Sequence, residues 1–172
     1  MKMDSDEESE QQIYEGHYVH YKFSPAYLDI TERWFIRRQY HTNCRFMNTC
    51  WLLEMIFQLK PEAENVSCSI KLYRSDSMND PVRATVWVSF YEVDARSPFI
   101  SQDFRKKQIF SGEKLEGCIA EIVPEEKSIT HEELVVRVSI YIRCSHPEYQ
   151  NNDVATIVGT KKSERKGVRS KM

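Results

Sequence analysis

Cysteine and histidine side chains are the residues of this chain that could bind a metal ion. The chain has five of each, and a zinc site could draw on His20, His41, Cys44 and Cys50. Structural zinc sites usually take their ligands in tight pairs such as Cys-x2-Cys. No such pair occurs in this sequence. We therefore predict that the protein binds no metal.

Catalytic groups can be sought among the same thiols and among the carboxylates. A cysteine nucleophile could use His131 or His146 as its base, but any chain with five cysteines and five histidines offers such pairs. A run of glutamates could supply an acid and a base, but a solvated loop is the better explanation of Glu121, Glu125, Glu126, Glu132 and Glu133. Glycine-rich phosphate loops, HExxH and GxSxG are absent. We predict a protein that is not an enzyme and needs no cofactor.

The composition favours one intracellular domain with charged tails. The 172 residues have a net charge of −2, which argues against a surface that binds nucleic acid throughout. Residues 1–17 predict a disordered acidic tail and residues 145–172 a flexible basic tail, which leaves residues 18–144 as the domain. The basic tail suits nuclear import, a weak polyanion contact or plain solvation.

The same pattern predicts where the protein works. No apolar run approaches the roughly 18 residues that cross a bilayer, so we expect no membrane contact. The acidic start has no apolar stretch of the kind that a secretory signal needs. An odd number of cysteines without close pairing favours reduced thiols. These features predict a cytoplasmic or nuclear protein.

Apolar residues recur with a period of two along several segments, which is typical of half-buried strands. Residues 133–143 and 82–91 alternate most clearly, with these residues on one face: Leu134, Val136, Val138, Ile140 and Ile142 in the first, and Ala84, Val86, Val88 and Phe90 in the second. Shorter runs predict strands near residues 20–30, 69–73, 99–110 and 118–123. About seven or eight such segments, without helical spacers, predict an all-β fold, a seven- to eight-stranded antiparallel β-sandwich.

Two segments allow more than one interpretation. Residues 34–40 could form a strand or a turn of helix. Residues 44–59 contain good helix formers, yet Trp51 and the alternate apolar residues after it fit a strand, with Trp51 in the core. Trp87 lies on the face opposite Val86, so it is either exposed or packed against another sheet.

The order of these runs resembles the MATH (TRAF-like) domain family, with the nearest likeness to the MATH domains of speckle-type POZ proteins. The resemblance spans roughly residues 18–143 and rests on five stretches: Lys22-Phe23-Ser24, Phe46 to Leu53, Ser69 to Tyr73, Val82 to Ser89, and Glu133 to Ile140. It implies an eight-stranded antiparallel sandwich that grips a short, extended peptide in a shallow groove on one sheet.

The resemblance also implies partners. In MATH–BTB proteins a BTB domain recruits a cullin ubiquitin ligase, and in TRAF proteins a coiled coil trimerises the module. Neither neighbour is present in these 172 residues. We therefore expect a protein or peptide partner, with ubiquitin-ligase machinery reached only through a BTB region outside this sequence. The alternative is a stand-alone structural or assembly protein that binds its partners through another surface.

By resemblance, six residues fall at or near the family's groove: Tyr73, Val86, Phe104, Leu115, Gly117 and Cys118. Tyr73 matches the tyrosine of the family's serine–leucine–tyrosine strand. Val86 stands where the family has a groove phenylalanine, and residues 115–118 replace a tryptophan–glycine–phenylalanine turn. Because aromatic anchors usually dominate such interfaces, we expect a peptide that differs from the family's serine-rich ligands. Otherwise these are ordinary sheet residues.

Overall fold

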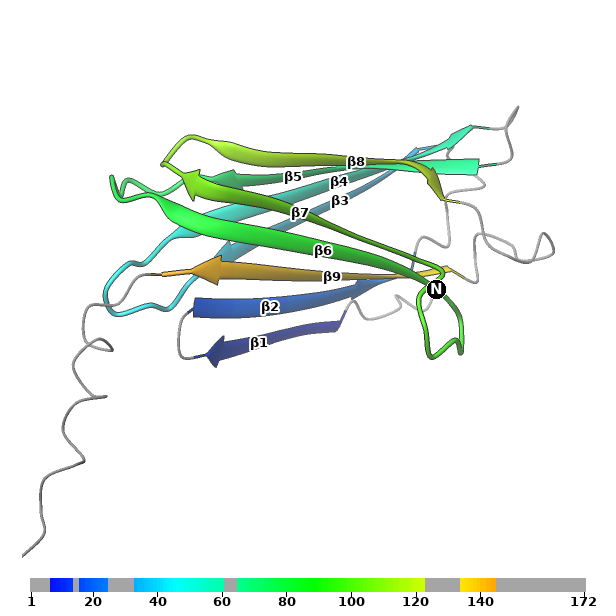
Figure 1. The fold of residues 1–172 in the computed structure, drawn as a ribbon, viewed down its shortest axis with the longest axis horizontal. Coiled ribbons are helices and arrows are strands. Elements are labelled where there is room, and N and C mark those ends of the chain that lie inside the picture. The colour runs from blue at the N-terminus through cyan, green and yellow to red at the C-terminus, as the bar shows by residue number, and fades with distance from the viewer. Residues whose placement is uncertain (1–6, 14–15, 25–32, 61–64, 123–133, 145–172) are drawn as a thin grey trace, which may run out of the picture.

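The computed structural model describes residues 7–13, 16–24, 33–60, 65–122 and 134–144. These residues form two antiparallel sheets that pack face to face (Figure 1). The described residues form nine strands and no helix. The strands are β1 (Glu7–Ile13), β2 (Gly16–Phe23), β3 (Arg33–His41), β4 (Cys50–Lys60), β5 (Asn65–Arg74), β6 (Val82–Glu92), β7 (Ile100–Ile109), β8 (Lys114–Ile122) and β9 (Leu134–Arg143). The predicted all-β antiparallel sandwich is confirmed, with nine strands among the described residues where seven or eight were expected.

The chain passes between the sheets four times. One sheet has the order β1-β2-β9-β6-β7 and the other the order β3-β4-β5-β8. The last strand, β9, therefore lies between β2 and β6 and pairs with both. This placement brings the two ends of the domain together in the middle of one sheet. Among the described residues, no helix is long and apolar enough to cross a membrane.

The N-terminal boundary differs from the prediction. Residues 7–13 form β1, which pairs with β2 from Glu7 opposite Lys22 to Ile13 opposite Gly16. These residues were expected in a disordered acidic tail, because they lack apolar alternation and carry several acidic side chains. Residues 7–13 are ordered as a strand by backbone hydrogen bonds to β2, which do not depend on an apolar pattern in the sequence. The predicted basic tail, residues 145–172, lies outside the described residues.

Each of the two segments that allowed more than one interpretation contains a strand and no helix. Residues 34–40 lie within β3, and β4 begins at Cys50, so that the residues from Cys44 to Thr49 form the connection between them. The early strand lies nearer the N-terminus than predicted: β2 begins at Gly16 and ends at Phe23, just before the Ser24-Pro25 step. Proline disfavours a continuing ladder, because it has no N–H group to donate.

The core lies between the sheets and is built from the predicted inward faces. Trp51 is fully buried, and the apolar sets of β6 and β9 are almost fully excluded from solvent. Phe57 of β4 meets Phe90 of β6 edge to face, with ring centroids 6.3 Å apart. Such aromatic residues dominate the energetics of a core, since each buries a large apolar surface.

Phe104 of β7 closes the seam between the two sheets at the β7–β8 edge. It lies opposite Val86 in the ladder, so both side chains point inward. Its ring covers Gly117 of β8 so closely that a Cβ atom at this glycine would lie only 2.3 Å from the ring. Gly117 therefore has a packing role, because any side chain there must displace Phe104.

Substituting Gly117→Ala should lower the free energy of unfolding by about 1–3 kcal/mol, which is the usual cost of overfilling a packed site. The cost should shrink in a Phe104→Ala background, because the small residue leaves room for the methyl group. Urea denaturation of the two single variants and the double variant gives the coupling energy. Equal costs of Gly117→Ala in both backgrounds would contradict the close contact.

Candidate functional site

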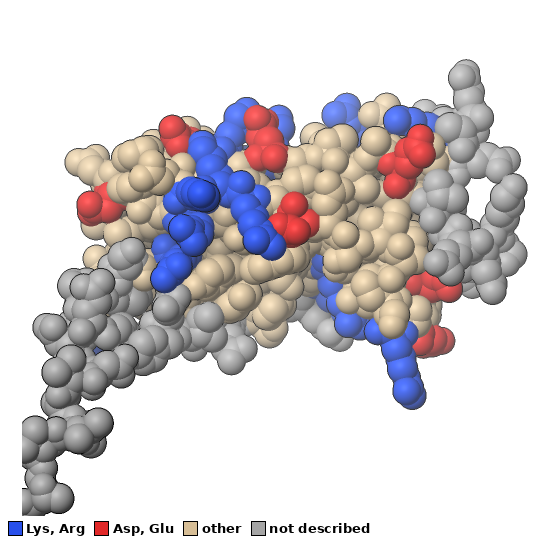
Figure 2. Space-filling view, viewed as in Figure 1, with Lys and Arg blue, Asp and Glu red and all other residues tan. Residues whose placement is uncertain are grey.

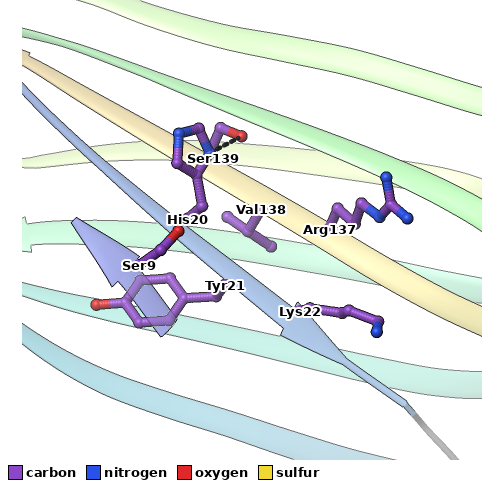
Figure 3. A pocket seen from close by; sticks show the side chains of 7 residues that line it. All are labelled: Ser9, His20, Tyr21, Lys22, Arg137, Val138 and Ser139. Atoms are coloured by element: carbon purple, nitrogen blue, oxygen red, sulfur yellow. Dashed lines mark hydrogen bonds between the residues drawn. The ribbon is translucent and has the colours of Figure 1, made fainter. Parts of the chain in front are cut away.

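The outer face of the five-stranded sheet bears a stack of aromatic rings. Tyr18 lies against Tyr141 with centroids 4.6 Å apart, and against Trp87 at 5.9 Å. His20 extends the stack at 5.8 Å from Tyr18, and its Nδ1 atom lies 2.8 Å from the Ser139 hydroxyl (Figure 3). Trp87 is thus on the outer face, half buried by its neighbours and not by the other sheet.

Basic side chains accompany this stack. Figure 2 shows Lys and Arg gathered on the same face toward the end at which β7 and β9 end. Arg83 of β6 and Arg143 of β9 are direct cross-strand partners, an arrangement of like charges that costs free energy in a sheet. Arg137 lies over the ring of Tyr91, 4.4 Å from its centroid. A shallow hollow of about 220 Å³ beside the stack is lined by residues of β1, β2 and β9, including Arg137 and Lys22 (Figure 3).

The outer face of the four-stranded sheet carries a row of alternating charge, which we call the charged row: Arg37, Glu54, Lys71 and Glu116, one residue from each strand in register. Arg37 Nε lies 3.3 Å from Glu54 Oε1, and Lys71 Nζ lies 3.9 Å from Glu116 Oε1. Opposite charges on neighbouring strands stabilise their pairing modestly. The charged row therefore places opposite charges side by side across all four strands, with an exposed ion pair at each of its two ends.

Tyr73 lies beside the charged row, in a neighbouring row with Leu52 and Lys114. Its side chain faces outward and is 38% exposed, so the ring is available to a binding partner. A depression of about 760 Å³, here called the Tyr73 depression, surrounds these two side chains: its lining is Leu52, Glu54, Lys71, Tyr73, Lys106, Gly112, Glu113, Lys114 and Glu116. An apolar centre with a polar rim is the arrangement typical of surfaces that bind other proteins or peptides.

Ion pairs border the Tyr73 depression. Lys106 donates to Glu113 Oε2 at 2.9 Å and to the Lys114 carbonyl at 3.2 Å. Lys114 Nζ lies 2.8 Å from Glu116 Oε1. Hydrogen bonds from Lys106 and Lys114 lower the pKa values of Glu113 and Glu116 respectively. The depression therefore presents three ammonium groups and three carboxylates at neutral pH, with no excess of either charge.

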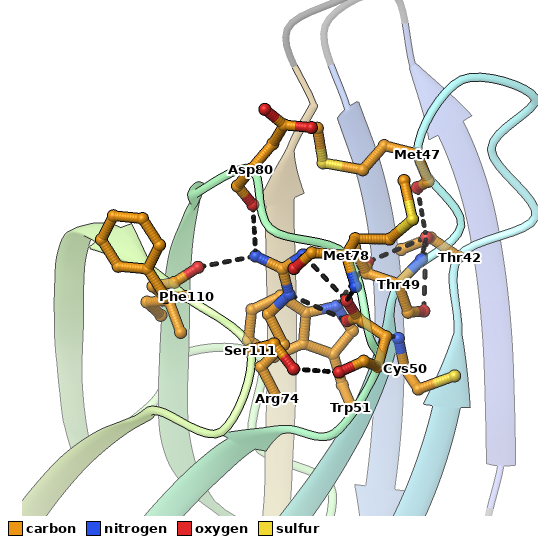
Figure 4. Close-up of polar contacts among 12 residues, drawn as sticks. Thr42, Met47, Thr49, Cys50, Trp51, Arg74, Met78, Asp80, Phe110 and Ser111 are labelled. Carbon is orange, nitrogen blue, oxygen red and sulfur yellow. Dashed lines mark hydrogen bonds and ion pairs between the residues drawn. The ribbon is translucent and has the colours of Figure 1, made fainter.

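Arg74, the residue after Tyr73, holds this end of the sandwich together (Figure 4). Its side chain is fully buried, and it forms a two-pronged pair with Asp76, with Nε–Oδ2 at 2.8 Å and Nη2–Oδ1 at 2.9 Å. The remaining guanidinium donors reach the carbonyls of Met78, Asp80 and Ile109. Every N–H of the buried cation thus has a partner, which burial of a charge requires.

The same residues shape the β7–β8 turn, which supplies one wall of the depression. The Arg74 backbone carbonyl accepts a hydrogen bond from the Gly112 N–H at 2.9 Å. The Arg74 backbone N–H donates a hydrogen bond to the Glu113 carbonyl, also at 2.9 Å. The Ser111 hydroxyl donates to the Asp76 carbonyl. Gly112 has a φ of 81°, a conformation that glycine adopts without strain. The turn and the anchor therefore position Gly112 and Glu113 beside Tyr73.

Asp76 is held in its charged form. Burial alone would raise its pKa, but hydrogen bonds from Arg74 and from the backbone N–H groups of Met78 and Cys50, together with the Arg74 charge, lower it. The Cys50 N–H donates to Oδ2 at 3.1 Å, which ties the start of β4 to the same carboxylate. Trp51 follows directly and donates its indole N–H to the Thr49 hydroxyl at 2.8 Å.

The six residues predicted for a groove fall into two groups. Tyr73 and Cys118 face outward on the four-stranded sheet, where Cys118 lies opposite Ser69. The others point into the sandwich: Val86 and Leu115 are buried in the core, and Phe104 and Gly117 meet at the seam. The structure thus brings Tyr73 into the depression and leaves the other five outside its lining. Strand parity separates them, because neighbouring residues face opposite sides.

Two of the residues considered as zinc ligands, His41 and Cys50, form a cysteine–histidine pair. Cys50 Sγ lies 2.9 Å from His41 Nδ1, because the two residues are partners at the β3–β4 ladder end. Burial and the nearby charge of Asp76 raise the pKa of the Cys50 thiol. A nucleophilic cysteine needs a lowered pKa, so this environment opposes thiolate chemistry. Cys44, considered with these two as a metal ligand, lies elsewhere, beside His17 and Cys144.

No protein-family model matches this chain, and no curated protein sequence matches it either. Membership of the MATH family therefore stays a prediction from the quoted stretches. The β-sandwich architecture is shared by many unrelated functions, so function must be argued from the surfaces themselves.

Substituting Arg74→Met should lower the free energy of unfolding by about 3–5 kcal/mol, because it leaves the Asp76 carboxylate buried without its partner. Arg37→Met is the matched control: it removes the same side chain from the exposed pair with Glu54, at a cost of about 1 kcal/mol or less. Urea denaturation measures both. Equal losses for the two variants would refute the anchoring role of Arg74.

The lowered pKa of Asp76 predicts a pH dependence of stability. A carboxyl whose pKa is lower in the folded state stabilises the fold above its unfolded pKa of about 4, and this contribution is lost as the pH falls through the folded value. The free energy of unfolding should therefore drop on acidification below about pH 4–5. Asp76→Asn should lower stability at pH 7 and flatten this acid dependence. If the free energy of unfolding of Asp76→Asn fell on acidification as steeply as that of the wild type, Asp76 would not be the group responsible.

Proposed function

We propose that the protein is a non-catalytic interaction module that binds an extended peptide segment of a partner protein across the Tyr73 depression. The observation that carries the proposal is the exposed Tyr73 ring beside Leu52, at the centre of a depression walled by charged side chains. Tyrosine is enriched among the residues that dominate binding interfaces, since it offers both apolar area and a hydroxyl.

The chemistry of the depression defines the ligand. Its apolar centre is small, so it suits one apolar side chain of the peptide. The equal numbers of lysines and glutamates suit flanking residues of both charges or of none. An extended peptide directs alternate side chains to the same side. A segment with one apolar residue between polar neighbours therefore matches this surface best.

The environments of the thiols support a role without catalysis. Burial raises the pKa of Cys68 and also raises that of Cys144, to about 12. All five cysteines are free thiols, which agrees with a reducing compartment such as the cytoplasm or nucleus. The resemblance to MATH–BTB proteins supports one use for peptide binding there, namely delivery of the bound partner to a cullin ubiquitin ligase through a BTB region.

A second candidate function is assembly with a partner through the outer face of the five-stranded sheet. The ring stack of Tyr18, Trp87 and Tyr141 favours it, because half-exposed aromatic rings beside arginines are typical of interface centres. In this case the protein would be a structural or assembly component, and the Tyr73 depression would have no ligand.

Peptide-array screening followed by affinity measurements on three variants separates the two functions. Tyr73→Ala should weaken every confirmed peptide by about tenfold or more, because it removes the anchor of the depression. Phe35→Ala, which removes a ring that is 60% exposed on the same sheet face but outside the depression, should leave binding unchanged.

Trp87→Ala tests the second candidate in the same assay. Loss of binding in Trp87→Ala with full binding in Tyr73→Ala would move the function to the five-stranded sheet. Circular dichroism and urea denaturation of each variant show that it is folded, so that a loss of affinity reports the surface.

A further inference from the structure

Three buried side chains from distant parts of the chain converge at one end of the sandwich: His17, Cys44 and Cys144. Figure 1 shows that β2 begins and β9 ends at the same end of the five-stranded sheet. His17 lies near the start of β2 opposite Ile142, and Cys144 follows the last residue of β9. Cys44 comes from the β3–β4 connection. All three are at least 95% buried.

The ligand atoms of these residues are close together. One ring nitrogen of His17 and the two Sγ atoms lie within 4.8 Å of one another. A tetrahedral zinc ion, with Zn–S near 2.3 Å and Zn–N near 2.0–2.1 Å, would place such atoms about 3.5–3.8 Å apart. A contraction of at most about 1.3 Å closes the site. Cys44 and Cys144 lie outside regular strands, where such a movement meets least resistance.

The donor set selects the kind of ion. Two thiolates and one imidazole are soft and intermediate ligands, which favour Zn²⁺ or Cu⁺ over Mg²⁺ or Ca²⁺. Two thiolates also balance the charge of Zn²⁺, so that the loaded site would add no net charge to the interior. Burial raises the pKa of Cys144, and the positive charge of the neighbouring Arg74 opposes this rise. The charge of Arg74 is itself compensated by the ion pair with Asp76.

We propose that His17, Cys44 and Cys144 form a structural Zn²⁺ site. The ion would tie the start of β2, the β3–β4 connection and the end of β9 to one point. His17, Cys44 and Cys144 would supply three ligands to the ion, and a water molecule would take the fourth tetrahedral position. Binding releases the thiol protons to solvent, so the site needs no redox partner.

The test uses the full chain, reduced and freed of metal, and titrated with Zn²⁺ alone and with Co²⁺ alone. We expect one equivalent of Zn²⁺ per chain and a rise in the thermal midpoint of about 4 °C or more at saturating metal. Bound Co²⁺ should show thiolate-to-metal charge-transfer absorption with the intensity of two Co–S bonds and the visible bands of tetrahedral coordination.

Cys44→Ser and Cys144→Ser should each lose the charge-transfer band and the thermal shift. Cys68→Ser is the matched control, because Cys68 is fully buried yet lies outside the cluster, and it should bind metal normally. Cys50→Ser tests whether the His41–Cys50 pair takes the ion instead.

Four results would overturn the proposal: no metal-induced thermal shift, a Co²⁺ spectrum without thiolate bands, loss of binding in Cys50→Ser alone, or a Cys44–Cys144 disulfide as the stable form under mild reduction. The wild-type Co²⁺ spectrum counts thiolate ligands by itself, so the proposal remains open to refutation even if a cysteine variant does not fold.

Discussion

The buried ion pair of Arg74 and Asp76 is the constraint on which one end of this sandwich depends. A guanidinium without solvent must satisfy all five of its N–H donors within the protein. Here those donors reach Asp76 and the carbonyls of Met78, Asp80 and Ile109. The pair thereby fixes the β5–β6 connection, the end of β7 and the start of β4 at once. Three segments that belong to two sheets share one charged group.

The Tyr73 depression and the proposed zinc site lie on two sides of this anchor. Tyr73 precedes Arg74 on the outer face of β5, and the β7–β8 turn that walls its depression bonds to the Arg74 backbone. Cys144 of the proposed zinc site lies on the inner side, close enough for the Arg74 charge to influence its pKa. A surface that binds a flexible partner benefits from a rigid support, because less order must be created on binding.

Strand parity explains why the site expected from sequence divided into two groups. Val86, Phe104 and Leu115 fill the interior, whereas Tyr73 and Cys118 face solvent. The large ring of Phe104 lies over Gly117 and seals the seam, so these two residues serve packing. What remains on the outer face of the four-stranded sheet is the charged row, with the exposed Tyr73 ring beside it and the Phe35 ring outside the depression. The six residues also come from both sheets, because Val86 and Phe104 belong to β6 and β7 and the other four to β5 and β8.

The sequence by itself determined the inward faces of the strands that show clear apolar alternation, but it indicated neither β1 nor, without a helical alternative, β3. Alternation with a period of two is a local property, so the buried sets of β6 and β9 and the burial of Trp51 could be predicted from neighbouring residues alone. The tertiary structure decided which strands pair. The position of β9 between β2 and β6 brings His17 to Cys144, and the register of four strands creates the charged row. Likewise β1 exists through its pairing with β2, since its own residues show no apolar pattern. Cross-strand contacts join residues far apart in the chain, and no spacing along the sequence encodes them.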